Sequence, residues 1–326
     1  MLIRTDRIGD VILTLPMIDV LKQNYPRAKI DFLVNKRVYD LVCDYPNINK
    51  VHAIEKVTIN NMRRLCGGNK YDLAIVVRPL FAIAFGLFLG GVKHRLGSAY
   101  RWYSLFFNIK HYQHRKYSVK HELEYNLDLL FELNCKMIKG IRPELKVGID
   151  ELDRVKNKLM ERRINLSKDF IVIHIPSMDS AKVWSRNNFT ELINLILNDP
   201  KCDFNIILTG TKDDAQQVKS VIDKLENNMR VYEILDLNLK ELAALLKIAK
   251  LFAGNSTGPI HIAAAVSTFV VGFYSPVKVE SQTRWGPYTH NRKIFSPPAD
   301  DDSRDVMDDI EPGEVFSFIK NYMLTN

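Results

Sequence analysis

GNSTGPIHIAAAV, at residues 254–266, follows a short apolar run and leads into a series of small residues. This order predicts a strand, a tight turn and the N-terminus of a helix. The turn contains two glycines, two residues typical of N-caps and a proline tolerated in a first helical turn: Gly254, Gly258, Ser256, Thr257 and Pro259. Because a helix N-terminus carries roughly half a positive charge on unpaired amides, the turn is suited to a phosphate or diphosphate. An ordinary capped helix fits the same residues, so the rest of the chain has to decide.

Apolar runs and helix-like segments alternate along the chain, and this rhythm is typical of βαβ units. We therefore predict an α/β protein of two doubly wound, Rossmann-like domains that face a central cleft. After the first strand we expect one helix over 10–24. The linker falls within 134–148, which gives domains at 1–147 and 148–326. The last helix, over 312–324, could pack back on the N-terminal domain.

The composition is that of a globular protein, with 46% hydrophobic and 26% charged residues among 326. The four cysteines lie far apart, without a CxxC pair or metal-ligand spacing, which favours reduced cysteines in the cytoplasm. Met1 leads almost directly into a strand-like run, so we expect no secretory signal. The longest apolar stretch, 79–91, is shorter than the roughly 20 residues that span a bilayer, so we expect no transmembrane helix.

The net charge of +8 is concentrated in one part of the chain. Residues 73–121 contain no Asp or Glu, but they contain eight Lys or Arg residues and many aromatic side chains. Such a mixture favours an anionic, partly apolar partner such as membrane lipid. Nucleic acid and a merely solvated basic face are the alternatives.

Five segments in register carry a family resemblance: IRTDRIGDVILTLP at 3–16, HIPSMDSAKVWSRNNFTELI at 174–193, LTGTKDDAQ at 208–216, GNSTGPIHIAAA at 254–265 and FYSPVKVESQTRWGPY at 273–288. Together they cover nearly the whole chain. On these segments the chain resembles the bacterial heptosyltransferases, which are inverting glycosyltransferases of the two-domain GT-B type. The resemblance implies an N-terminal domain that binds the acceptor and a C-terminal domain that binds the nucleotide sugar.

The resemblance also assigns the catalytic groups. Asp10, which follows Gly9 in the first loop, would be the general base on the acceptor hydroxyl. From spacing alone, Asp10 would be read as a cap on the helix that follows, and the resemblance reverses that order. Lys182 and the amides of Thr257 and Gly258 would stabilise the departing diphosphate, so the resemblance implies catalysis without a metal or another cofactor. The aspartates at 300 and 302 precede a helix, where we expect them to favour its N-terminus rather than hold an ion.

Contacts to the donor are also implied by the resemblance. Asp213 or Asp214 would accept bonds from the ribose, and the backbone near Leu237 would contact adenine. The remaining donor contacts would come from Gly9, Ser177, Ser256, Thr257, Gly258, Pro259 and His261. Two departures put the sugar in doubt: Ile175 interrupts the usual His-Pro-Gly sequence, and Ser256 stands where many members have an aspartate. A lone histidine in a small-residue helix is also typical of simple packing.

Basic residues in this segment and shortly before it are candidates for binding the acceptor, which we expect to be the anionic inner core of lipopolysaccharide at the cytoplasmic face of the inner membrane. They are Arg63, Arg64, Lys93, Arg95 and Arg101. Arginine suits planar carboxylates and phosphates. We expect a peripheral membrane contact and no nucleic acid. Two other functions stay open: a GT-B enzyme that uses another nucleotide sugar, and a catalytically silent protein that binds sugar nucleotides or lipid.

Overall fold

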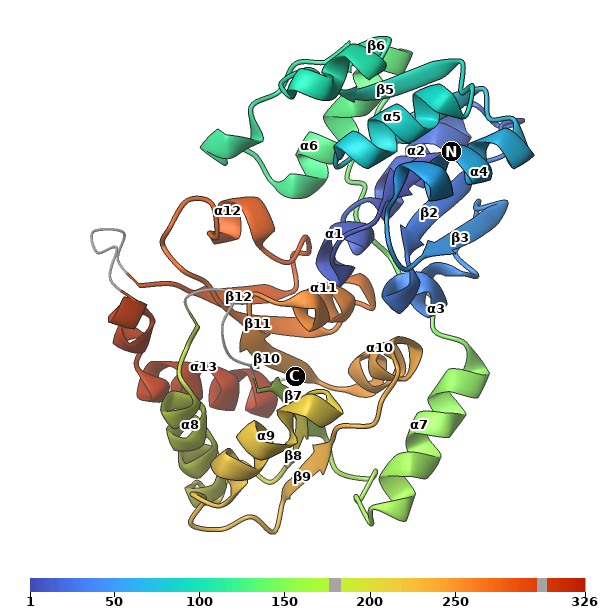
Figure 1. Cartoon of the computed structure of the whole chain (residues 1–326). Helices are drawn as coiled ribbons and strands as arrows, with labels where there is room; N and C mark the ends of the chain where they lie inside the picture. The colour runs from blue at the N-terminus through green and yellow to red at the C-terminus, as the bar shows by residue number, and fades with distance from the viewer. Residues whose placement is uncertain (176–182, 298–303, 326) are drawn as a thin grey trace. The chain divides into compact units, whose positions relative to one another are not determined.

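The computed structural model describes residues 1–175, 183–297 and 304–325, without the side chains of 304–306. The chain divides into two compact units, Met1–Glu144 and Leu145–Asn326. The division lies three residues before the boundary expected from the linker. Each unit is an α/β layer structure with its own sheet (Figure 1).

The first unit is built on a six-stranded parallel sheet in the order β3-β2-β1-β4-β5-β6. Its strands are β1 (Leu2–Arg4), β2 (Asp31–Asn35), β3 (Lys50–Ile54), β4 (Leu73–Val76), β5 (His94–Ser98) and β6 (Ile109–His111). Its α-helices are α1 (Ile8–Ile12), α2 (Leu15–Asn24), α3 (Tyr39–Val42), α4 (Ile59–Asn69), α5 (Phe81–Leu89) and α6 (Glu122–Asp128). Its 3-10 turns are η1 (Lys36–Val38), η2 (Trp102–Phe106), η3 (Arg115–Tyr117) and η4 (Leu129–Leu133).

Helices α4 and α5 pack against each other on one face of this sheet (Figure 1). Their apolar side chains form a core with alternate residues of the strands, such as Ile3 and Leu33. The two helices approach closely at Gly86, where a Cβ atom would lie 2.4 Å from Cβ of Met62. Because real Cβ atoms do not approach this closely, a larger residue at 86 would push the two helices apart.

The helix expected over 10–24 is in fact two helices, α1 and α2. Pro16 has no backbone N–H, so it cannot donate the hydrogen bond that would extend α1. It lies instead in the first turn of α2, where that N–H is not needed. The break frees the carbonyl of Leu13, which accepts a bond from the amide of Asn126 in α6 at 3.0 Å. Helix α6 is thereby tied to the end of α1, the helix that carries Asp10.

The second unit repeats the arrangement with a parallel sheet in the order β12-β11-β10-β7-β8-β9. Its strands are β7 (Phe170–His174), β8 (Asn205–Thr209), β9 (Val231–Ile234), β10 (Leu251–Asn255), β11 (Phe269–Phe273) and β12 (Arg292–Phe295). Its α-helices are α7 (Ile149–Glu161), α8 (Arg186–Asn198), α9 (Ala215–Ile222), α10 (Leu239–Ile248), α11 (Gly258–Ala265), α12 (Gln282–Trp285) and α13 (Pro312–Thr325), with 3-10 turns η5 (Lys212–Asp214) and η6 (Arg304–Asp309).

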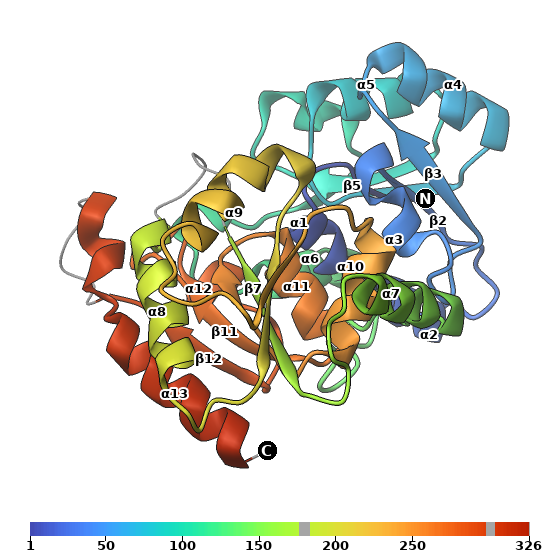
Figure 2. The ribbon, with the colours of Figure 1, turned by 90° about the horizontal axis from the view of Figure 1, so that it is seen from below.

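The last helix, α13, packs along α8 in the second unit, as both views of the ribbon show (Figure 2). Val315 and Ile319 of α13 are buried in the same core as Phe189 of α8. From the sequence, this helix could also have packed on the first domain. Its apolar face is instead used by the second unit.

In each sheet the first strand lies in the middle, and the direction of winding reverses beside it, between β1 and β4 and between β7 and β10. Doubly wound sheets bind ligands at the carboxyl ends of the strands at such a switch point. Helix α1, which follows β1, carries Asp10, and Thr257 and Gly258 lie where the turn after β10 enters α11. The fold therefore places both predicted groups at the carboxyl edge of their own sheets.

Candidate active site

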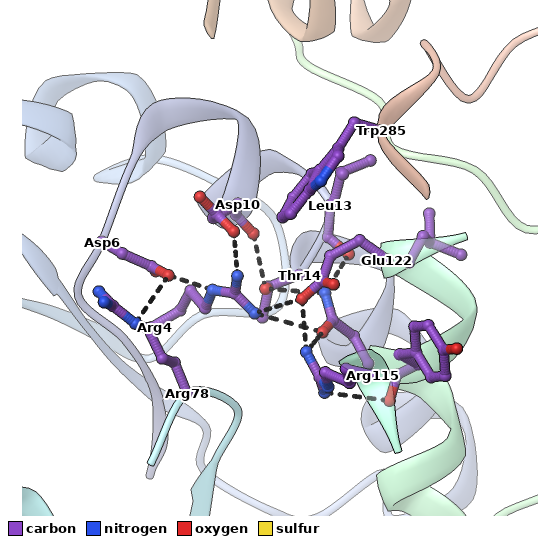
Figure 3. A network of polar contacts seen from close by, with 12 residues as sticks. Arg4, Asp6, Asp10, Leu13, Thr14, Arg78, Arg115, Glu122 and Trp285 are labelled. Atoms are coloured by element: carbon purple, nitrogen blue, oxygen red, sulfur yellow. Dashed lines mark hydrogen bonds and ion pairs between the residues drawn. The ribbon is translucent and has the colours of Figure 1, made fainter. Parts of the chain in front are cut away.

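A buried arginine organises the polar groups at the switch point of the first unit. Arg4, the last residue of β1, is 3% exposed. Its guanidinium donates to Asp6 at 2.7 Å, to Glu122 at 3.2 Å, to Asn126 at 3.3 Å, and also to Asp10 (Figure 3). One cation thus holds three carboxylates from three segments of the chain.

Asp10 is presented by the short helix α1 and not by a capping position. The N-cap of α1 is Arg7, which makes no side-chain capping bond, and Asp10 is the third residue of the helix. The Asp10 carboxylate contacts Arg4, while its carbonyl accepts a bond from the hydroxyl of Thr14 at 2.8 Å. The structure therefore excludes the alternative in which Asp10 serves as the helix cap.

The environment makes Asp10 a stronger base than an ordinary aspartate. Burial raises its pKa, and the nearby carboxylates of Asp6 and Glu122 raise it further, while Arg4 works in the opposite direction. Burial also disfavours the charge on Arg4, but its three carboxylates outweigh that effect and raise the pKa of the guanidinium. Arg4 therefore stays charged, whereas the carboxyl of Asp10 binds a proton more readily than an ordinary aspartate does.

Two further arginines complete the network. Arg115 donates to Glu122 at 2.5 Å, to Asn126 at 3.0 Å and to the carbonyl of Tyr125 at 3.2 Å. Arg78, which follows β4 and is half exposed, lies 3.8 Å from Asp6. Three arginines thus balance three carboxylates beside β1 and β4 (Figure 3).

In the second unit, the turn after β10 leaves the start of α11 without a side-chain cap. Thr257 occupies the N-cap with extended backbone angles and makes no capping bond among the described residues. Its hydroxyl instead donates to the carbonyl of Asn255 at 3.3 Å. Because no side chain of the described residues caps the first amides of α11, which start at Gly258, these amides have the arrangement that an anion would need.

The other residues of this turn are held in place by their neighbours. Ser256 hydrogen-bonds to Tyr274. Burial raises the pKa of Tyr274 above its ordinary value, and the bond to Ser256 only partly opposes this shift. Pro259 lies in the first turn of α11, and His261 is buried in the same helix. The hydroxyl that replaces the usual aspartate is therefore engaged with a buried tyrosine.

Asn255 links this turn to the segment that contains Lys182. Its side-chain oxygen accepts a bond from the amide of Trp184 at 2.8 Å, and its NH₂ group donates to the carbonyl of Trp184 at 3.3 Å. The indole of Trp184 is fully buried and donates to the carbonyl of Ile310 at 2.8 Å. Trp184 follows Lys182 by two positions. Lys182 and Ser177 themselves, like Asp300 and Asp302, lie outside the described residues.

His174 ends β7 on the other side of the switch point, directly beside Gly254 of β10. Burial lowers the pKa of this histidine to about 4, although Asp214 opposes the shift. Its Nδ1 atom lies 3.2 Å from the hydroxyl of Thr209. His174 is therefore a neutral polar group at neutral pH.

The predicted nucleoside contacts lie at the carboxyl ends of the outer strands. Asp214 accepts bonds from the amide and the hydroxyl of Thr211, each at 2.7 Å, and so caps its own turn. Asp213, the residue before it, is exposed on the same turn. Leu237 is half-buried between β9 and α10.

The structure does not bring the five predicted acceptor residues together. Arg101 follows β5 at the carboxyl edge, whereas Lys93 precedes β5 at the opposite edge. Arg63 and Arg64 are exposed on α4. Arg95 has a structural role: its guanidinium donates to the carbonyls of Phe106 at 2.6 Å and Val92 at 2.5 Å, and burial lowers its pKa.

A cavity of about 860 Å³ opens at the amino edge of the first sheet, beside the starts of β1, β2 and β5. None of the predicted site residues lines it, so it is separate from the switch-point cluster. Among the described residues, no three His, Cys, Asp or Glu side chains group as metal ligands. No helix in the described ranges is both long and apolar enough to cross a bilayer.

Two doubly wound α/β units, each with polar groups at its switch point, have the architecture of GT-B glycosyltransferases. The solved structure of Escherichia coli ADP-heptose lipopolysaccharide heptosyltransferase II shares this fold, with a TM-score of 0.83 at 18% identity over 99% of this chain and 98% of that one. Residues 59–311 match the model of glycosyltransferase family 9 (heptosyltransferase), and the chain belongs to this family.

Curated relatives agree with this assignment. A Haemophilus influenzae protein provisionally named as a glycosyltransferase is 28% identical over 355 residues, covering 100% of this chain and 98% of that protein. Lipopolysaccharide heptosyltransferase 3 of Escherichia coli is 25% identical over 302 residues, covering 88% and 85% of the two chains. The protein is therefore a glycosyltransferase, as the sequence resemblance implied.

Proposed function

We propose that the protein transfers a heptose from ADP-heptose, with inversion, to an anionic acceptor in the lipopolysaccharide inner core. The observation that carries the proposal is the Asp10 carboxylate, which is buried at the switch point, held by Arg4 and raised in pKa. A heptosyltransferase needs one such base for the attacking hydroxyl. Family membership and the names of the relatives, which include ADP-heptose and lipopolysaccharide, support the donor and the acceptor.

The proposed reaction is a single displacement. The Asp10 carboxylate takes the proton of the acceptor hydroxyl while that oxygen forms a bond to the anomeric carbon of the donor. The bond from this carbon to the diphosphate oxygen breaks, and ADP leaves with the electron pair. Because attack and departure occur on opposite sides of the carbon, the configuration inverts.

On the donor side, the uncapped amides at Thr257 and Gly258 would receive the negative charge that develops on the diphosphate. We assign Lys182 the same task, and Asn255 the task of anchoring the end of its segment through Trp184. Asp213 would bind the ribose, and the backbone near Leu237 would contact adenine. Cationic and amide groups of this kind can take the place of a metal ion.

Calorimetric titration with ADP, UDP, GDP and ADP-heptose tests the donor, and a transfer assay with a lipopolysaccharide inner-core acceptor tests the reaction. We expect selective binding of ADP and ADP-heptose that weakens in Lys182→Ala. The anomeric configuration of the product, read by NMR, tests the inversion. A preference for UDP or GDP would assign another nucleotide sugar to the same fold and contradict the proposed donor.

We also propose that the first unit contacts the inner membrane from the cytoplasmic side. Apolar and aromatic side chains form a patch on α5 and η2: Phe81, Phe85, Phe88, Leu89, Trp102, Leu105 and Phe106. Trp102 is 70% exposed and Leu105 is 62% exposed. The surrounding segment 73–121 has eight cations and no acid, which suits an apolar boundary beneath anionic headgroups.

Co-sedimentation with vesicles that contain anionic lipid tests this contact. Trp102→Ser combined with Leu105→Ser should reduce the bound fraction, and Arg101→Glu should do so mainly at low salt, because headgroup attraction is screened. Met229→Ser, which removes an apolar side chain that is 80% exposed from the second unit, is the matched control. Equal binding of all variants, or equal binding to neutral vesicles, would remove the membrane contact.

A further inference from the structure

A second group of exposed rings lies at the carboxyl ends of β5 and β6. Tyr100 follows β5, and Tyr112, His114 and Tyr117 belong to the connection between β6 and α6. Tyr100 and His114 stack with ring centroids 3.7 Å apart. Tyr112 meets Tyr100 edge-on at 6.0 Å, and Tyr117 meets His114 edge-on at 5.6 Å. We call these four side chains the aromatic platform.

The aromatic platform differs chemically from the apolar patch on α5 and η2. Its rings are tyrosines and a histidine, and Tyr112 is 69% exposed and Tyr117 56% exposed. Gln113, between two of these residues in sequence, has buried amide atoms with no hydrogen-bond partner among the described residues. Rings with polar groups are suited to a hydrated, polar partner rather than to lipid chains.

The segment that carries the platform is fastened to the catalytic network. Arg115 lies between His114 and Tyr117, and its guanidinium binds Glu122 and Asn126. These are the residues that also contact Arg4, which in turn holds Asp10. Both groups lie at the carboxyl edge of one sheet, where β1, β5 and β6 end.

We propose that the aromatic platform binds a sugar ring of the acceptor, a role that rests on the proposed glycosyl transfer. The C–H groups on one face of a pyranose pack against an aromatic ring, while its hydroxyls bond to the tyrosine hydroxyls. Arg101 and Lys116, the cations beside the rings in sequence, face the carboxylate or phosphate groups of an acidic saccharide. Arg115 acts as a positioning residue that fixes the platform relative to Asp10.

Kinetics of the full-length protein provide the first test. In Tyr100→Ala and His114→Ala, we expect the KM for the acceptor to rise about 10-fold or more, with the KM for the donor within two-fold of the wild-type value. Base stacking on aromatic side chains has effects of about this size. Tyr25→Ala is the matched control, because Tyr25 is 44% exposed, close to the 46% of Tyr100, but lies at the amino edge. Unchanged acceptor KM in both platform variants would overturn the proposal.

Binding without a donor separates this inference from the proposed function. Saturation-transfer NMR with a deacylated inner-core oligosaccharide should show contacts to the protein that disappear in His114→Ala and persist in Tyr25→Ala. If this pattern holds but no nucleotide sugar is transferred, the platform stands and the proposed reaction fails. If transfer occurs but the variants lose binding only to single-stranded oligonucleotides or to anionic vesicles, the platform belongs to another partner and the inference is wrong. Denaturation midpoints of the variants should match the wild type.

Discussion

Replacing Asp10 by Asn separates its chemistry from its place in the fold. The substitution keeps the size and shape of the side chain and removes the proton acceptor. The amide oxygen can still accept the bond from Arg4, which retains Asp6 and Glu122 as partners. A positioned general base contributes about 10²- to 10⁴-fold to a rate, so turnover should fall by that factor, or about 3–5 kcal/mol in activation free energy.

The free energy of unfolding should change little in Asp10→Asn. The pKa of Asp10 is raised above its ordinary value of 3.8, chiefly by burial. A carboxyl with a raised pKa favours folding at low pH, and this contribution is lost as the pH rises through its folded-state pKa. At neutral pH the ionised group therefore opposes folding, so its removal relieves a cost that offsets the weaker bond to Arg4. We expect a change within about 1 kcal/mol.

Transfer rates with saturating ADP-heptose, together with urea denaturation, measure both effects. The profile of kcat/KM against pH adds a third readout, because the wild-type rate should fall on acidification with an apparent pKa above 3.8. Asp10→Asn should lose this acid limb. Asp40→Asn, an exposed aspartate on α3, is the matched control. Activity of Asp10→Asn within a few-fold of the wild type would refute the assignment of Asp10 as the base.

Three further substitutions test the supporting structure. Arg4→Met should lower the free energy of unfolding by about 3–5 kcal/mol, because it leaves buried carboxylates without their cation; urea denaturation checks this, and Arg27→Met, on the exposed surface, should have no such effect. Asn255→Ala leaves the amide and carbonyl of Trp184 unpaired, so it should cost about 1–3 kcal/mol and weaken ADP binding by calorimetry; unchanged affinity would contradict a link between Trp184 and the donor. Burial lowers the pKa of His174 from 6.5 to about 4, so the unfolded chain binds a proton there before the folded protein does, and stability should fall as the pH drops through this window. In His174→Gln, the thermal midpoint should depend less on pH between 6.5 and 4.

The sequence predicted those parts of the fold whose causes are local. The turn at 254–258 combines glycines, N-cap residues and a proline, and the structure places the end of β10 and the start of α11 there. The alternation of apolar runs predicted two doubly wound α/β units, which the two sheets confirm. Short strands with polar residues were missed: β5, HRLGS, has no apolar alternation to reveal it.

The network around Arg4 was largely invisible in the sequence, because its partners come from distant segments. Arg4 and Glu122 are 118 positions apart, and nothing local marks either as buried and paired. Arg95 and Arg101 lie in the same basic, aromatic segment of the sequence. Only the fold shows that the guanidinium of Arg95 already donates hydrogen bonds to backbone carbonyls. That Lys93 and Arg101 lie at opposite edges of the sheet follows only from the position of β5, which runs between them.

The composition of the Arg4 cluster has a chemical consequence for Asp10. A single arginine paired with a single aspartate would lower the pKa of the carboxyl and weaken it as a base. Here the same cation is shared with Asp6 and Glu122, and both of these carboxylates raise the pKa of Asp10. The cluster can therefore hold Asp10 in a fixed orientation through a strong contact without making it a poor proton acceptor. Because Arg115 also binds Glu122, the segment that presents the aromatic platform contributes to the same balance of charge.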